Sequence, residues 1–80
     1  MKAMKTLNFR IRLEKEEEGG YTVIVPALKG CVTFGETVDE AIAMAKEAIE
    51  GYIETLIDLG KEVPTDNDVL EYTVSVVAHA

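Results

Sequence analysis

The stretch Val25–Thr37, VPALKGCVTFGET, links a strand-like run to the start of a helix and decides how this chain folds. Pro26 has no backbone N–H to donate to a sheet, so we expect the preceding strand to end there. Gly30 is expected to turn the corner, and Gly35 to let the chain swing into the helix, because glycine adopts conformations closed to other residues. Three apolar residues of the stretch are expected to enter the core: Leu28, Cys31 and Val32. The stretch therefore predicts a structural corner.

A long helix is predicted after this corner. Thr37-Val38-Asp39-Glu40 fits the capping box, in which the Thr37 hydroxyl accepts the Glu40 N–H and the Glu40 carboxylate reaches back to the cap. The apolar period then changes to about 3.6 residues, and Gly60 supplies a stop signal for a helix that ends near Leu59. The stripe expected to face the core is Val38, Ala41, Ile42, Ala45, Ile49, Tyr52, Ile53 and Leu56.

Four strands are predicted around this helix. Lys5 to Lys15 alternates apolar and polar residues, which is typical of a half-buried strand. Glu16 to Gly20 indicates a charged hairpin tip, because its two glycines tolerate positive φ. Further strands are expected at Tyr21–Val25, Val32–Phe34 and Leu70–Ala78. The expected fold class is α+β with the order β-β-β-α-β: a four-stranded mixed sheet, covered on one face by one long helix, whose fourth strand returns beside the first by a right-handed crossover.

The composition bounds the class of protein. Eighty residues suit one small domain over residues 1–80, and the single cysteine allows no internal disulfide. No segment is apolar for long enough to span a membrane, so we expect a soluble, cytoplasmic protein. A chain of this size has only a small core, so we also expect it to form homo-oligomers, dimers or tetramers. Residues 1–35 carry a net charge of +2 and residues 36–80 one of −9, which gives the total of −7. Such an acidic chain is a poor nucleic-acid binder and suits a basic partner.

No residue pattern predicts catalysis. A nucleophilic Cys31 needs a base, and the single histidine, His79, is next to the C-terminus, where fraying is expected. One cysteine and one histidine do not make a zinc site, and the sequence has no glycine-rich phosphate loop. A two-metal nuclease needs carboxylates that project together from strand interiors, and the predicted strands do not supply them. We therefore expect a solvated acidic face, and no catalytic residue, metal or cofactor.

The chain resembles the N-terminal domain of HicB-type antitoxins over about residues 5–78. The resemblance rests on a Gly-Gly-Tyr strand, a Val-Pro-x-Leu-x-Gly-Cys corner, a Thr-x-Gly-Glu-Thr cap and an Asp-Glu-Ala helix start, closing with Gly60 and Pro64. Each of these pieces is weak alone, whereas their combination is specific. The residues that carry it are Gly20, Tyr21, Pro26, Leu28, Gly30, Cys31, Gly35, Thr37, Glu40 and Ala41.

The resemblance implies a partial ribonuclease H-like fold and a function. HicB antitoxins bind and neutralise a HicA toxin, a small basic RNA-cleaving protein, and many carry a C-terminal DNA-binding domain. Because this chain ends after its fourth predicted strand, we expect no such domain, no direct contact with nucleic acid and no ribonuclease H activity. The alternative is a non-catalytic oligomerisation or regulatory module without a toxin partner. The residues expected to contact the partner are Glu16, Glu17, Glu18, Lys29, Glu36, Glu47, Glu50 and Glu54.

Overall fold

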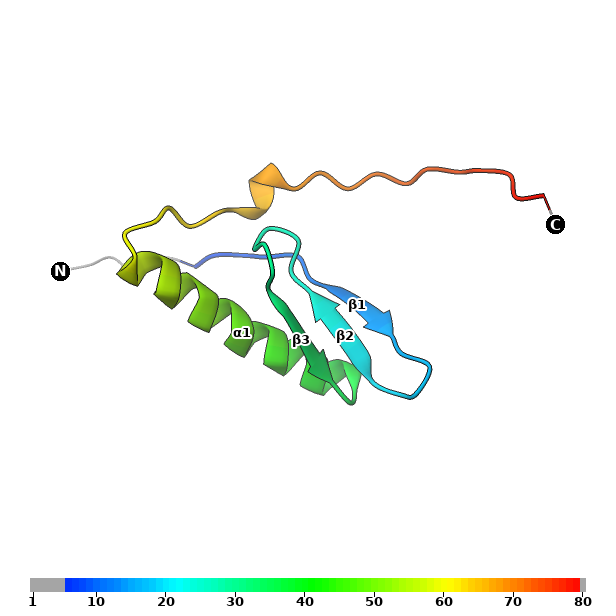
Figure 1. Cartoon of the computed structure of the whole chain (residues 1–80), viewed down its shortest axis with the longest axis horizontal. Helices are drawn as coiled ribbons and strands as arrows, with labels where there is room; N and C mark the ends of the chain where they lie inside the picture. Colours follow the sequence, from blue (N-terminus) through cyan, green and yellow to red (C-terminus); the bar gives the residue numbers. More distant parts are fainter. Residues whose placement is uncertain (1–5, 80) are drawn as a thin grey trace.

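A three-stranded sheet with one long helix across one of its faces forms the folded part of the chain (Figure 1). The computed structural model describes residues 6–79. The α+β class and the order of the first four elements are as the sequence predicts. The elements are β1 (Arg12–Lys15), β2 (Tyr21–Ile24), β3 (Val32–Gly35), α1 (Val38–Asp58) and a 3₁₀ turn at Asp66–Asp68.

The sheet is an antiparallel meander in the order β1-β2-β3. Val23 of β2 is fully buried with two alanines of α1, and the register places Leu13 and Thr33 beside it on the same face. Side chains alternate between the two faces of a strand, so the neighbouring residues point away from α1. The face opposite the helix therefore carries Arg12, Glu14, Thr22, Ile24, Val32 and Phe34.

The first strand is shorter than the sequence predicts. Alternation predicts a strand over Lys5–Lys15, but pairing with β2 begins only at Arg12, and Lys5 lies outside the described residues. The partner strand explains the difference, because β2 ends at Ile24, directly before the chain turns into the corner. Residues 6–11 consequently have no strand of the meander opposite them. The hairpin tip is confirmed, with positive φ at Gly19 and Gly20.

The predicted corner is confirmed, with one correction. Its loop closes on itself, because Val25 N–H donates to Cys31 O at 3.1 Å and Cys31 N–H donates to Leu28 O at 3.0 Å. Gly30 makes the turn with a φ of 78°. Val25, Leu28 and Cys31 form a buried cluster against apolar side chains of α1 and of residues 9–11. The prediction for Val32 was wrong: its side chain is 58% exposed, since it lies on the sheet face away from the helix.

Gly35 has a different structural role from the predicted one, which was to adopt a backbone conformation closed to other residues. It is buried, and it does not have the positive φ seen at four other glycines. A Cβ built on it would collide with the backbone nitrogen and Cα of Ala41, in the first turns of α1. Gly35 is therefore the point where the backbones of β3 and α1 pass too closely for any side chain to stand between them.

Both ends of α1 follow from the sequence. At the start, the Thr37 hydroxyl accepts a hydrogen bond from Glu40 N–H at 3.1 Å, whereas the return bond to the Glu40 carboxylate is not among the hydrogen bonds of the described residues. At the end, Gly60 N–H donates to Ile57 O at 3.0 Å and Lys61 N–H donates to Leu56 O at 2.8 Å. These two bonds, with a φ of 69° at Gly60, make a Schellman motif, which satisfies carbonyls left free by the last turn.

The apolar stripe of α1 is only partly buried. Ala41 and Ala45 are buried, whereas Val38 and Ile42 are exposed. Among the described residues, the helix packs mainly on β3 and β2, and of β1 only Leu13 packs against the cluster of Ala41 and Ala45, so the β1 side of α1 is only partly covered. The remaining residues of the stripe are half-buried: Ile49, Tyr52, Ile53 and Leu56.

The predicted fourth strand is absent from the described residues, and the sheet is three-stranded and antiparallel rather than four-stranded and mixed. After the 3₁₀ turn, residues 69–79 leave the sheet as an extended tail (Figure 1). The side chain of Tyr72 is 83% exposed, and that of Val76 is 84% exposed. Alternation shows that one face of a segment suits burial, but a strand forms only where a sheet edge lies beside it.

Candidate binding surfaces

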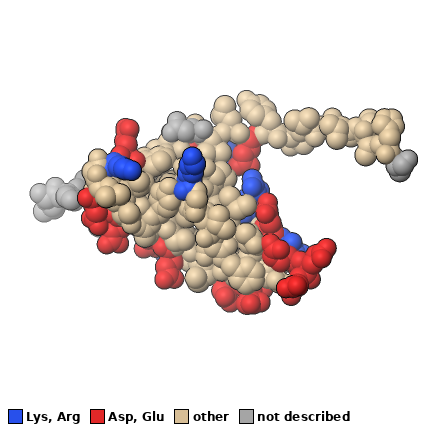
Figure 2. All heavy atoms as spheres, viewed as in Figure 1, with Lys and Arg blue, Asp and Glu red and all other residues tan. Residues whose placement is uncertain are grey.

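Acidic side chains gather at one end of the sheet. The register pairs Tyr21 with both Lys15 and Gly35, so the hairpin tip and the turn from β3 into α1 lie at the same end. Figure 2 shows clusters of acidic groups over the hairpin and along the lower edge of the molecule. We call this region the acidic end, and its exposed residues are Glu16, Glu17, Glu18, Glu36, Asp39 and Glu40.

The other predicted contact residues lie elsewhere. Lys29 is exposed in the corner, at the opposite end of β2 from the hairpin tip, and its carbonyl accepts a hydrogen bond from Tyr52 of α1 at 2.7 Å. Glu47, Glu50 and Glu54 are exposed along α1. The fold thus divides the predicted acids into an acidic end and a helix side and leaves Lys29 apart in the corner, and all eight residues stay predictions as contact sites.

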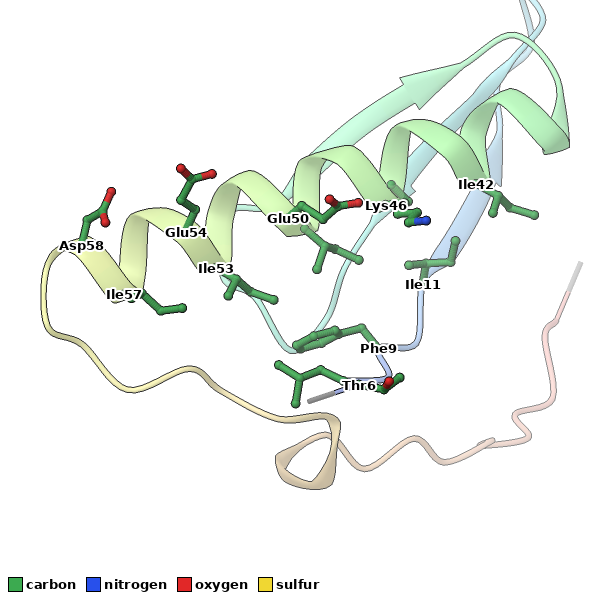
Figure 3. Close-up of a pocket in the computed structure, with 13 residues that line it drawn as sticks. Thr6, Phe9, Ile11, Ile42, Lys46, Glu50, Ile53, Glu54, Ile57 and Asp58 are labelled. Atoms are coloured by element: carbon green, nitrogen blue, oxygen red, sulfur yellow. The ribbon is translucent and has the colours of Figure 1, made fainter. Parts of the chain in front are cut away.

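A groove lies between α1 and residues 6–11, on the β1 side of the helix (Figure 3). Its volume is about 990 Å³ and its lining is mostly apolar. The floor and walls come from Leu7, Phe9, Ile11, Ile42, Ala45, Ile49, Ile53 and Ile57. Charged residues at its edge are Lys46, Glu50, Glu54 and Asp58. The sequence did not predict this groove, because the whole apolar stripe of the helix was assigned to the core. The stripe, extended by Ile57, is wide, and this width was the feature of the sequence that could have indicated a second apolar surface on the helix.

The sheet face opposite α1 is a second surface that no element of residues 6–79 covers. Ile24 and Val32 are paired neighbours there, and Phe34 lies further along β3. Arg12 and Glu14 flank them on β1, with 3.4 Å between the Arg12 Nε and Glu14 Oε2 atoms. This face mixes apolar and charged groups, so it suits a protein contact better than the binding of a small molecule.

Among the described residues, Cys31 and His79 do not form the nucleophile and base considered in the sequence. Cys31 is buried, and burial raises the pKa of its thiol, which favours the protonated, unreactive form. His79, the base considered for it, is exposed on the tail. Within residues 6–79, no three His, Cys, Asp or Glu side chains are grouped as a metal site requires. Across the same range, none of the helices has the length and apolarity needed to cross a membrane.

Comparison with known proteins points to one family. The model of the HicB-like antitoxins of bacterial toxin-antitoxin systems matches residues 9–77. A UPF0150 protein of Synechocystis sp. is 45% identical over 64 residues, which cover 80% of this chain and 81% of the relative.

Solved structures agree with this match. The crystal structure of the Burkholderia pseudomallei antitoxin HicB superposes with a TM-score of 0.65 and 38% identity, covering 89% of this chain and 48% of that one. Its N-terminal domain alone gives a TM-score of 0.63 and 40% identity, covering 85% of this chain and 72% of that one. This chain therefore spans about half the length of the full antitoxin. The family match over nearly the whole chain, together with these structures, shows that the chain belongs to the HicB-like antitoxin family.

Proposed function

We propose that this protein is an antitoxin-type inhibitor that binds and neutralises a small, basic, RNA-cleaving toxin in the cytoplasm, with no catalysis of its own. The observation that carries the proposal is the match of residues 9–77 to antitoxins of bacterial toxin-antitoxin systems. A HicA-like toxin is the partner that this family implies. Because such a toxin cleaves RNA in the cytoplasm, its inhibitor is expected in the same compartment.

Charge supports the same partner. The chain has a net charge of −7, and a protein that cleaves RNA needs a basic surface to hold phosphates. Complementary charge steers two proteins together and raises the rate of association. Of the two groups of predicted contact residues, we favour the acidic end, where Glu16, Glu17, Glu18 and Glu36 form one exposed surface. Asp39 and Glu40 add to its charge, although acids in the first turn also stabilise α1.

The experiment is a binding and inhibition assay with the basic product of the neighbouring reading frame. The two proteins are expected to form a stable complex that weakens as salt rises, and in which RNA cleavage stops. A local contact is tested by reversing two charges, Glu17→Lys with Glu18→Lys. The matched control reverses two charges on α1, Glu50→Lys with Glu54→Lys, and changes the net charge equally.

Loss of about 10-fold in affinity is expected for the hairpin pair, with a smaller change for the α1 pair. Equal losses would mean that net charge alone attracts the toxin, and a larger loss for the α1 pair would move the contact to the helix side. A neighbouring basic toxin that neither binds this chain nor is inhibited by it would overturn the proposed function.

A second candidate function is self-association without a toxin. The observation in its favour is the exposed apolar surface, on the tail and on the face opposite α1. Large exposed apolar patches mark protein contacts, and most homo-oligomers use one self-complementary patch. A stable homo-oligomer with no toxin-binding activity would identify this function, whereas an antitoxin can also self-associate.

A further inference from the structure

The C-terminal tail carries a strand pattern that its own domain does not use. Residues 69–79 are extended, and among the described residues they pair with no strand. Every second side chain from Leu70 to Val76 is apolar and largely exposed: Leu70, Tyr72, Val74 and Val76. Water contact with so much apolar surface is unfavourable, so this face of the tail is suited to a partner.

The groove on the β1 side of α1 is a matching site. Among residues 6–79, β1 pairs with β2 alone, so the backbone N–H and C=O groups of its other edge have no strand partner there and can bind an added strand. The isoleucines of α1 that line the groove extend from Ile42 to Ile57, a length of about 22 Å at the helical rise per residue. The tail from Leu70 to Val76 covers about 20 Å as a strand. Length and apolar character therefore agree.

The tail of the same chain is directed away from this groove. Arg10 binds the carboxylate of Asp66 through two contacts. The backbone N–H of Arg10 donates to Asp66 Oδ1 at 3.2 Å, and the Arg10 Nε atom lies 3.0 Å from Asp66 Oδ2. The 3₁₀ turn follows at once, and the tail beyond it runs clear of the folded part (Figure 1). The molecule measures 60 × 28 × 20 Å, so its long axis is about twice what a compact domain needs. The tail, residues 69–79, therefore does not cover the groove of its own chain.

The exposed area of the chain is larger than that of a compact monomer. The accessible surface is 6895 Å², whereas a compact monomer of 8.8 kDa exposes about 4,800 Å². The excess of about 2,100 Å² exceeds the roughly 800 Å² that each partner buries in a standard interface. A second copy supplies both the tail that fits the groove and a groove for the first tail.

The geometry points to a reciprocal strand exchange: residues 69–77 of one copy add to the free edge of β1 in a second copy, and their apolar face covers its groove. This two-fold arrangement completes a four-stranded sheet in each half. It rests on the second candidate function, self-association, and is independent of toxin binding. Asp66 and Arg10 act as the fixed point from which each tail crosses to the other copy.

The test compares the oligomeric state of the full chain with that of paired tail variants. Val74→Lys with Val76→Lys places charge on the apolar face of the tail, and the matched control, Thr73→Lys with Ser75→Lys, places it on the opposite face. Sedimentation equilibrium is expected to show a dimer for the parent and the control, and dimerisation at least about 100-fold weaker for the first pair. Ile53→Lys, in the groove, is expected to weaken it similarly, with circular dichroism to verify folding.

Two single-cysteine variants on a Cys31→Ala background locate the tail. Val74→Cys in one preparation and Ile49→Cys in another are mixed and oxidised. The expected product is a disulfide that joins position 74 of one chain to position 49 of the other, in excess of the disulfides that join two identical positions. A double variant that closes only an intramolecular disulfide would show the tail folding back on its own domain and overturn the exchange. A dimer insensitive to Val74→Lys with Val76→Lys would also overturn it, while leaving self-association through the face opposite α1. A monomeric parent would overturn both.

Discussion

The close approach at Gly35 leads to a test with an internal control. Gly35→Ala adds one methyl group where the structure has backbone on the other side: the new Cβ would collide with Ala41 N and Cα and lie 2.8 Å from the carbonyl carbon of Glu40. Backbone atoms of a helix cannot rotate away as a side chain can, so the start of α1 has to move off β3. The control is Gly51→Ala in α1, where the added Cβ meets nothing within 4 Å.

The two identical changes are expected to have opposite signs. Overpacking a buried site costs about 1–3 kcal/mol, and a clash with backbone belongs at the upper end of that range. Alanine is favoured over glycine in an exposed helix by about 0.8–1 kcal/mol, so Gly51→Ala should stabilise by up to that amount. For a domain of this size each kcal/mol shifts Tm by about 4–8 °C.

Urea unfolding followed by circular dichroism measures both free energies of unfolding. Two protein concentrations are needed, because association would couple to folding and raise the apparent stability. Expected values are a loss of about 3 kcal/mol for Gly35→Ala and a gain below about 1 kcal/mol for Gly51→Ala. A Gly35→Ala variant as stable as the parent would refute the reasoning, since β3 and α1 would then tolerate a side chain between them.

Three further changes probe the fold. Leu28→Ala, at a side chain that is 1% exposed, should cost about 2–5 kcal/mol in urea unfolding, and a cost near zero would mean that the corner is not packed. Thr37→Ala should cost about 1 kcal/mol by loss of the helix cap, while Thr37→Ser keeps most of it; equal stability of the two would argue against the cap. Burial raises the pKa of the Cys31 thiol above its unfolded value, so its contribution to stability is complete below the ordinary thiol pKa and is lost as pH rises toward the raised one. A pH titration of stability should therefore fall more steeply at alkaline pH in the parent than in Cys31→Ala, and parallel curves would contradict the burial of the thiol.

The sequence by itself determined the local structure. The hairpin tip at Gly19 and Gly20, the corner at Gly30 and the Schellman end at Gly60 each depend on a few neighbouring residues with a distinctive backbone conformation. The cap at Thr37 is equally local, since its hydroxyl bonds an amide three residues away. Such features can be predicted because the residues that cause them lie within a few positions of one another in the sequence. The family resemblance is built from the same residues, which is why it was visible in the sequence.

Only the tertiary structure decided which elements meet. Val32 and Gly35 belong to one short strand, yet Val32 is exposed and Gly35 lies against α1, because each depends on the face from which the helix approaches. Ile42 is part of an apolar stripe but faces the groove, since α1 packs on β2 and β3 and leaves the β1 side open. The same is true of the tail, residues 69–79. Its alternation predicts which of its faces is suited to burial but not which sheet edge it pairs with. Burial and strand pairing depend on residues far apart in the chain, and those pairings are decided by packing the whole molecule.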